Sequence, residues 1–213
     1  GVNGHVPALG DSQDKDVSPE VNAKRLRETG YNAFRLWGAR GFADPVSAKQ
    51  GKFKACAKGD NSPLDLFDRF YAACKKEGIF LWITAPHYYP FEFGPSLKKP
   101  PVPGEPSLLD DDSFLAEGDD WDAWKKAVQT QGFNLEYAKF FDDRLLRLFR
   151  RQTTEFLNHV NFYTGIRYAE DEALAILSFD NENAFTRMVL ENGIASWPGF
   201  FQDKVIREWN GWL

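Results

Sequence analysis

The chain has 213 residues, 43% of them hydrophobic and 15% aromatic, and its 26 Lys and Arg against 31 Asp and Glu give a net charge of −5. This composition supports a substantial buried core and excludes disorder as the main state. The acidic balance, without a long basic stretch, disfavours nucleic acid as a partner. No apolar segment approaches the roughly 18 to 20 residues that span a bilayer, and the first residues lack a signal-peptide pattern, so we expect no membrane segment.

Short apolar runs alternate with helical patterns along the chain, which is typical of βα units that build a parallel sheet. Four strands are predicted, at residues 1–6, 33–37 and 79–84 and in the apolar run that begins at Ala173. Four parallel strands do not close a barrel, whereas eight do, in chains of roughly 250 residues. We therefore expect an α/β fold in which residues 1–213 supply about the first four βα units of a (β/α)8 TIM barrel, as one incomplete domain.

Capping signals mark the expected helices. Ser18 suits an N-cap, Pro19 the first helical position and Gly30 the helix end. A second helix is predicted to begin at Pro63 and to stop at Gly78. Further helices are expected around Trp121 and Trp124, at about 142–161 and at 198–213.

The fourth predicted strand leads into polar residues. Its aliphatic run is expected to be buried on both faces, as in a parallel sheet that helices cover. Asn181 and Glu182 follow shortly after this run. In α/β barrels the working residues project from the carboxyl ends of the strands, so a carboxylate here is predicted to act on a bound ligand.

Three other features bear on the organisation of the chain. Residues 85–135 are rich in proline, glycine and acids and are expected to form an insertion that walls or covers a cleft. Both ends look cut, because Gly1 begins inside a predicted strand and Leu213 ends an apolar helical pattern without a C-cap. Cys74 is expected to be buried on a helix and Cys56 to lie in a loop, so a disulfide and the redox compartment stay open.

Short motifs stand at the ends of successive predicted strands. Residues 32–36 read Asn-Ala-Phe-Arg-Leu, residues 85–87 read Ala-Pro-His, and Asn181-Glu182 follows the fourth strand after the stretch 161–168. In this order, over nearly the whole chain, they resemble the amino-terminal half of a glycoside hydrolase of clan A, closest to the cellulase-like family five. The resemblance implies a carbohydrate substrate and suggests a secreted or periplasmic protein.

The chain departs from the family in two respects. Asn183 stands where the family usually has proline, and Asp180 adds a carboxyl group beside the motif. The family's nucleophilic glutamate lies at the end of a seventh strand, which the chain does not contain. The resemblance therefore implies that the nucleophile and the remaining half of the barrel lie outside these residues.

The resemblance gives Glu182 the role of general acid/base. Retaining glycosidases use two carboxyl groups roughly 5 to 5.5 Å apart, one to protonate the leaving oxygen and one to attack the anomeric carbon. An enclosed cleft or a second carboxylate would keep the first of them protonated at neutral pH. An ordinary loop acid is the alternative interpretation of Glu182.

Other polar residues are predicted to bind the substrate or to tune the site. Asn181 would hydrogen-bond the sugar 2-hydroxyl, and Arg35 would orient the nucleophile and lower its pKa. His87 would bind a substrate hydroxyl or the carboxylates, and His5 is a further candidate at the end of the first strand. A turn asparagine, a salt bridge at the barrel rim and structural histidines are the alternatives.

Aromatic rings suit sugars because their flat faces cover the C–H patches of a pyranose. Trp37, Tyr88 and Tyr89 are therefore candidate subsite residues, with Trp121 and Trp124 as weaker ones, although any of them can equally pack in the core. The acidic triplet at 110–112 lacks the alternate spacing of a calcium loop. We expect neither a metal nor an organic cofactor.

The leading hypothesis is a retaining β-glycoside hydrolase, similar to cellulases, endoglucanases or mannanases, that acts on a β-linked polysaccharide or oligosaccharide. The chain alone is expected to be inactive unless it pairs with the remaining half of the barrel. The first alternative is a barrel that binds carbohydrate but lacks the second carboxylate. A barrel enzyme of other chemistry, such as an aldolase, would call for a strand-end lysine, and none occurs in the four predicted strands.

Overall fold

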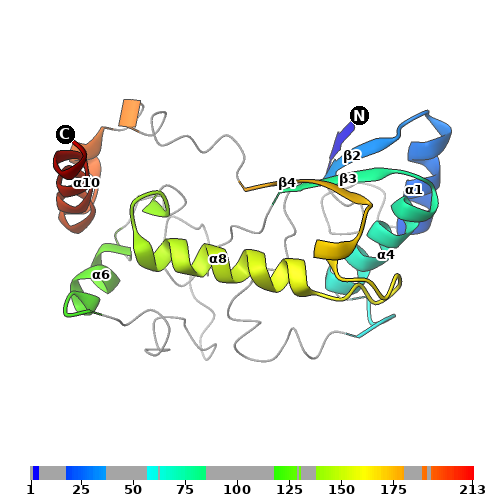
Figure 1. The fold of residues 1–213 in the computed structure, drawn as a ribbon, viewed down its shortest axis with the longest axis horizontal. Coiled ribbons are helices and arrows are strands. Elements are labelled where there is room, and N and C mark those ends of the chain that lie inside the picture. The colour runs from blue at the N-terminus through cyan, green and yellow to red at the C-terminus, as the bar shows by residue number, and fades with distance from the viewer. Residues whose placement is uncertain are drawn as a thin grey trace. The chain divides into compact units, whose positions relative to one another are not determined.

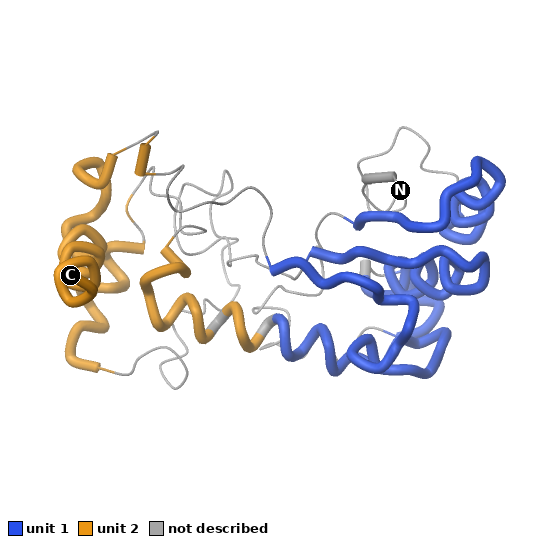
Figure 2. Tube along the Cα trace, turned by 45° about the horizontal axis from the view of Figure 1, so that its top comes forward, with its two compact units in different colours: residues 1–43, 51–87, 152–181 blue, residues 44–50, 88–151, 182–213 orange. Residues whose placement is uncertain are grey.

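The computed structural model describes residues 2–4, 18–36, 57–61, 63–84, 118–128, 130, 138–179, 189–190 and 193–213. The chain divides into two compact units, which Figure 2 shows in different colours. The first unit comprises Gly1–Ala43, Gly51–His87 and Gln152–Asn181. The second comprises Asp44–Gln50, Tyr88–Arg151 and Glu182–Leu213.

The first unit is built on a parallel sheet of four strands in the order β1-β2-β3-β4 (Figure 1). These strands are β1 (Val2–Gly4), β2 (Ala33–Leu36), β3 (Phe80–Thr84) and β4 (Leu174–Ser178). The prediction of an α/β chain with a parallel sheet is confirmed. Among the described residues the sheet is open, so closure into a barrel stays a prediction.

Capping begins and ends the helices of this unit where the sequence predicts. Helix α1 (Pro19–Glu28) follows Ser18, whose side chain accepts a hydrogen bond of 3.3 Å from the backbone N–H of Val21. Helix α4 (Pro63–Lys76) is followed by Gly78, whose φ of 68° lies in the left-handed region that favours glycine. Both helices lie beside the sheet in Figure 1.

One face of the sheet packs against these helices, and we call it the helix side. Phe34 and Leu36 of β2 and Leu81 and Ile83 of β3 are buried there in one core with residues of α1 and α4. The ring of Phe34 meets that of Phe70 edge to face, with 5.6 Å between the ring centroids. Cys74 of α4 is buried in the same core, as predicted, whereas Cys56 lies outside the described residues.

We call the opposite face the open side. Arg35 lies opposite Trp82 in the β2–β3 register, and Trp82 lies opposite Ile176 in the β3–β4 register. Trp82 is 37% exposed and Ile176 is 49% exposed. The prediction that the fourth strand is buried on both faces is therefore wrong, because β4 lies at the edge of the described sheet and its open side is only partly covered.

The remaining elements lie outside the sheet. They are α6 (Trp121–Val128), α8 (Asp143–Asn158), α10 (Gly199–Trp212) and the short 3-10 helices η4 (Tyr168–Glu170) and η5 (Ile194–Ser196). In the second unit α6 contacts α10, and the buried Asp142 carboxylate accepts from the indole N–H of Trp124 at 3.1 Å and from Lys204 at 3.2 Å. Helix α8 ends at Asn158, before the predicted end at residue 161. Of the helices described, none is long and apolar enough to span a membrane.

Candidate functional site

The carboxyl ends of the four strands all lie at the same end of the sheet, because all four strands are parallel. These ends are Gly4, Leu36, Thr84 and Ser178. Each of them precedes predicted site residues by one to three positions in the sequence, namely His5, Trp37, His87 and Asn181 respectively. In the sequence, predicted site residues therefore follow each of the four strand ends that the parallel topology aligns.

Apart from the weaker candidates Trp121 and Trp124, Arg35 is the predicted site residue that the described part of the chain contains. It lies on β2, one residue before the carboxyl end of that strand, and is partly buried. The other predicted site residues lie outside the described residues, and their roles stay predictions: His5, Trp37, His87, Tyr88, Tyr89, Asn181 and Glu182. The weaker candidate Trp124 is fully buried, so its interpretation as a sugar-binding residue is wrong.

The guanidinium group of Arg35 lies over the indole ring of Trp82, 4.4 Å from the ring centroid. The indole N–H of Trp82 donates a hydrogen bond of 3.0 Å to the hydroxyl of Ser178, which donates one of 3.1 Å to the hydroxyl of Thr84. These contacts connect β2, β3 and β4 on the open side, close to their carboxyl ends. Trp82 and Ser178 were not predicted as site residues, because both belong to apolar runs that predict core strands.

The pairing of the predicted strands would have identified Trp82 as a neighbour of Arg35. Residues two apart share a face of a strand, so Trp82 and Thr84 share one face of β3. Pairing the β2 and β3 runs end to end places Arg35 beside Trp82. An arginine and a tryptophan as neighbours on one face of a sheet predict a cation–π contact rather than two core side chains.

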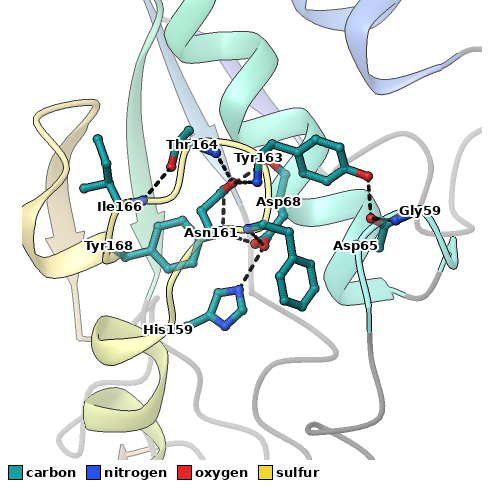
Figure 3. Close-up of polar contacts among 10 residues, drawn as sticks. Gly59, Asp65, Asp68, His159, Asn161, Tyr163, Thr164, Ile166 and Tyr168 are labelled. Carbon is teal, nitrogen blue, oxygen red and sulfur yellow. Dashed lines mark hydrogen bonds and ion pairs between the residues drawn. The ribbon is translucent and has the colours of Figure 1, made fainter.

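A second polar cluster joins α4 to the segment that leads into β4 (Figure 3), and we call it the α4 clasp. Its side chains belong to Asp65, Asp68, His159, Asn161, Tyr163 and Tyr168. The fully buried carboxylate of Asp68 accepts hydrogen bonds from the hydroxyl of Tyr168 and from the backbone N–H of Phe162 at 2.7 Å. It also lies 2.9 Å from Nε2 of His159.

Asn161 shapes the turn of this clasp. Its side-chain oxygen accepts hydrogen bonds from the backbone N–H groups of Tyr163 at 2.8 Å and Thr164 at 3.0 Å. Its side-chain amide donates to the backbone carbonyl of Asp68 at 3.1 Å and to the hydroxyl of Tyr168 at 3.3 Å. One buried side chain therefore holds both the turn and its attachment to α4.

Asp65 holds the other end of the clasp. It accepts hydrogen bonds from the backbone N–H groups of Gly59 at 2.7 Å and Asn61 at 3.1 Å, and from the hydroxyl of Tyr163 at 2.5 Å. Burial and the neighbouring Asp65 raise the pKa of the Tyr163 hydroxyl to about 12. Burial, together with the charge of Asp68, raises the pKa of Tyr168 well above its ordinary value.

The chemistry of the clasp is that of a structural connection. Both tyrosine hydroxyls remain protonated donors across the physiological pH range, because their pKa values are raised and each faces a carboxylate. Its buried carboxylates are hydrogen-bonded to groups of the same unit. We therefore assign the clasp to stability, so the strand ends remain the candidate place for chemistry. Among the residues with described positions, no group of three or more His, Cys, Asp or Glu is arranged to hold a metal ion.

No protein-family model and no curated protein matches the chain. Two solved structures from Thermotoga petrophila resemble it, an X-ray structure of endo-β-1,4-mannanase and the hyperthermostable endo-1,4-β-D-mannanase of strain RKU-1 with maltose and glycerol. Each is 19% identical, superposes with a TM-score of 0.48 and covers 85% of this chain. The chain spans 34% and 44% of those two chains. A likeness at this level assigns neither a family nor an activity.

Proposed function

We propose that the protein is a retaining β-glycoside hydrolase with Glu182 as its general acid/base. The observation that carries the proposal is the strand order β1-β2-β3-β4 with every pair parallel. A sheet wound in one direction is the arrangement of a (β/α)8 barrel, whereas a doubly wound sheet reverses its strand order at a switch point. The four strands thus support the first half of a barrel.

The common edge of the strand ends supports the assignment of residues to the site. In barrels of this kind the reacting groups come from the carboxyl ends of several strands. Glu182 follows the end of β4 by four positions, and Arg35 lies one position before the end of β2. His87 follows the end of β3 by three positions. Arg35 thus lies on β2, and His87 and Glu182 follow β3 and β4 in the sequence.

Each residue has a chemical role in the proposal. Glu182 protonates the leaving glycosidic oxygen and then, as a carboxylate, activates the water that hydrolyses the glycosyl intermediate. Asn181 donates to the sugar 2-hydroxyl, an interaction that strengthens in the transition state. Arg35 favours the charged form of the attacking carboxylate, which a later strand is proposed to supply.

The remaining candidates are proposed to bind the sugar. Trp37, Tyr88 and Tyr89 follow the ends of β2 and β3 and offer ring faces to pyranose units. His5 and His87 offer ring nitrogens to hydroxyls. The proposed substrate is a β-linked glucan, mannan or oligosaccharide, as in cellulase-like and mannanase-like enzymes.

The test compares Glu182→Gln with Glu172→Gln in the full-length protein. Glu172 precedes the amino end of β4, and its side chain is 86% exposed, so the same change there leaves the carboxyl-end edge untouched. With β-1,4-glucan or β-1,4-mannan, E182Q should lower kcat/KM by about 10³-fold, within the range for loss of a general acid. With aryl β-glycosides that carry good leaving groups the loss should be smaller, because their departure needs little protonation.

The outcomes separate the proposal from its rival. E172Q should retain the wild-type rate, and equal losses in both variants would count against the role of Glu182. A wild-type protein that binds these oligosaccharides in calorimetry but turns over none of them would be a carbohydrate-binding barrel instead. Product analysis by NMR should show retention of the anomeric configuration, and inversion would contradict the retaining mechanism.

A further inference from the structure

We propose that Trp82 is a positioning residue for Arg35, and that Ser178 fixes Trp82 in the orientation that this role requires. Neither residue belongs to the site predicted from the sequence. The inference rests on the proposed function, because it concerns the carboxylate that Arg35 is proposed to serve. It starts from the contacts on the open side of the sheet.

The first step is the stacking of Arg35 on Trp82. The two residues lie opposite each other in the β2–β3 register, and the guanidinium carbon is 4.4 Å from the centroid of the indole ring. An arginine side chain has several rotatable bonds and many accessible rotamers. Contact with the ring at this distance removes part of that freedom. Trp82 thereby limits the positions that the arginine N–H donors can take.

The second step is the anchoring of the indole. A tryptophan side chain that is 37% exposed would be free to change rotamer if only its ring packed against a neighbour. Here its N–H donates to Ser178 at 3.0 Å, and Ser178 donates in turn to Thr84 at 3.1 Å. Because Thr84 is almost fully buried, the chain of hydrogen bonds ends on a rigid strand position. The indole is thus held from both neighbouring strands.

The third step concerns what the stacked arginine can do. A guanidinium group carries five N–H donors that lie in its plane and point outward from its edge, so a guanidinium group over an aromatic ring can bind an anion as well. A carboxylate binds to that edge, often through two parallel hydrogen bonds. An arginine whose head group is held over Trp82 in this way is therefore suited to orient a carboxylate. The arginine also covers one face of Trp82, so that face is not a sugar platform.

The strand connections add a reason for this arrangement at this place. Ser178 is the last residue of β4 and precedes Glu182 by four positions. Arg35 is thus linked through Trp82 to the strand end from which the proposed acid/base follows. A change in the orientation of the indole would therefore affect both the arginine that is proposed to orient the nucleophilic carboxylate and the strand end that precedes Glu182.

The first experiment measures the positioning itself, on the full-length protein and without any substrate. In side-chain NMR spectra, the δ and ε protons of Arg35 should show an upfield ring-current shift that disappears in Trp82→Leu. Trp82→Phe should retain part of it, and Ser178→Ala should reduce it. Unshifted Arg35 resonances in the folded wild-type protein would overturn the inference whatever the protein's activity. Phe80→Leu is the matched control, since Phe80 lies on the same strand and face, two residues away, and is 52% exposed.

The second experiment follows the pH dependence of kcat/KM in the full-length protein with an aryl β-glycoside. Its acidic limb reports the ionisation of the nucleophilic carboxylate in the free enzyme. A correctly placed arginine lowers that pKa, so W82L should move the acidic limb upward by about half a unit to one unit. W82F should return the acidic limb most of the way to its wild-type position, a rescue that general destabilisation would not produce. F80L should leave the acidic limb at its wild-type position.

The outcomes distinguish the two proposals. An active wild-type protein whose acidic limb is the same in W82L as in the wild type would overturn the positioning role while the proposed function stands. A wild-type protein without any glycosidase activity would overturn the proposed function, and the positioning role with it. A shifted limb in W82L with rescue by W82F supports both.

Discussion

On the helix side of the sheet Ile83 is fully buried, whereas on the open side Ile176, which lies on the next strand, keeps 49% of its surface exposed. The polar groups differ in the same way. The carboxylates of the α4 clasp are hydrogen-bonded to groups of the same unit, and the Asp68 carboxylate alone contacts three neighbouring groups. On the open side a charged arginine is stacked near the strand ends.

This difference separates stability from chemistry. Buried carboxylates whose hydrogen bonds go to groups of the same unit serve the fold, so we assign the described polar groups of the helix side to stability. A partly exposed cation at the carboxyl ends of parallel strands is placed where barrel enzymes put their reactive groups. The acids that are most conspicuous in the structure are therefore not the ones proposed to react.

The same substitution, isoleucine to alanine, should have unequal effects on stability on the two faces of the sheet. Ile83→Ala should lower the free energy of unfolding by about 3 to 4 kcal/mol, because it removes apolar surface and leaves a cavity in the core. Ile176→Ala should cost less than about 1 kcal/mol, because much of that side chain is already in water. Urea unfolding followed by circular dichroism measures both. Equal losses would mean that the open side is as well covered as the helix side.

The clasp offers a second test, with a somewhat smaller effect. Asp68→Asn should lower the free energy of unfolding by about 3 kcal/mol, because it puts an amide donor against groups that already donate to this position. Asp122→Asn is the control, since the side chain of Asp122 is 93% exposed and pairs only with Lys125 in the described contacts of α6. Thermal unfolding measures both. A loss of glycosidase activity in D68N molecules that remain folded would contradict the purely structural role of the clasp.

Local signals predicted the elements of the fold well. Ser18 and Gly78 mark real helix ends, and the short helix at Trp121 is present as α6, because capping and periodicity act within a few residues. The parallel sheet also follows from the alternation of strands and helices. The exposure of the fourth strand could not be predicted in this way, because an apolar run predicts a strand but not how many neighbouring elements cover it.

The candidate site was less accessible to sequence reasoning. Arg35 was recognised by its position at a strand end, but its partner Trp82 was not, because contacts between strands depend on register. The clasp residues Asp68 and His159 are 91 positions apart, so no local pattern could have joined them. In the sequence, Asn161 stands out only as the first residue of the stretch 161–168 that carries the family resemblance. Its role in the turn appears only when its hydrogen bonds are seen.

The smallest predicted effect concerns the connection of α1 to α4 on the helix side, where Arg69 donates to both carboxylate oxygens of Glu20 at 3.0 Å. Partial burial is the largest single effect and raises the pKa of Glu20. The hydrogen bonds from Arg69, from the backbone and from Ser18, together with the charge of Arg69, outweigh it, so the pKa is lowered overall from 4.5. Because the lowered pKa belongs to the folded state, the pair stabilises the protein above the unfolded pKa and loses this contribution as the pH falls through the folded one. The side chain of Glu20 is 51% exposed, so Glu20→Gln should cost only about 0.5 kcal/mol at pH 7.

This cost should disappear in acid and shrink in concentrated salt, since screening weakens an exposed pair. Urea unfolding of E20Q and the wild type at pH 7 and at pH 3 measures the difference. Glu28→Gln, at the other end of α1, is the control, because its contact with Lys24 is longer, at 3.7 Å, and both side chains are largely exposed. If E20Q costs the same at both pH values, the contribution of Glu20 is not its charge, and the helix side is held there by packing alone.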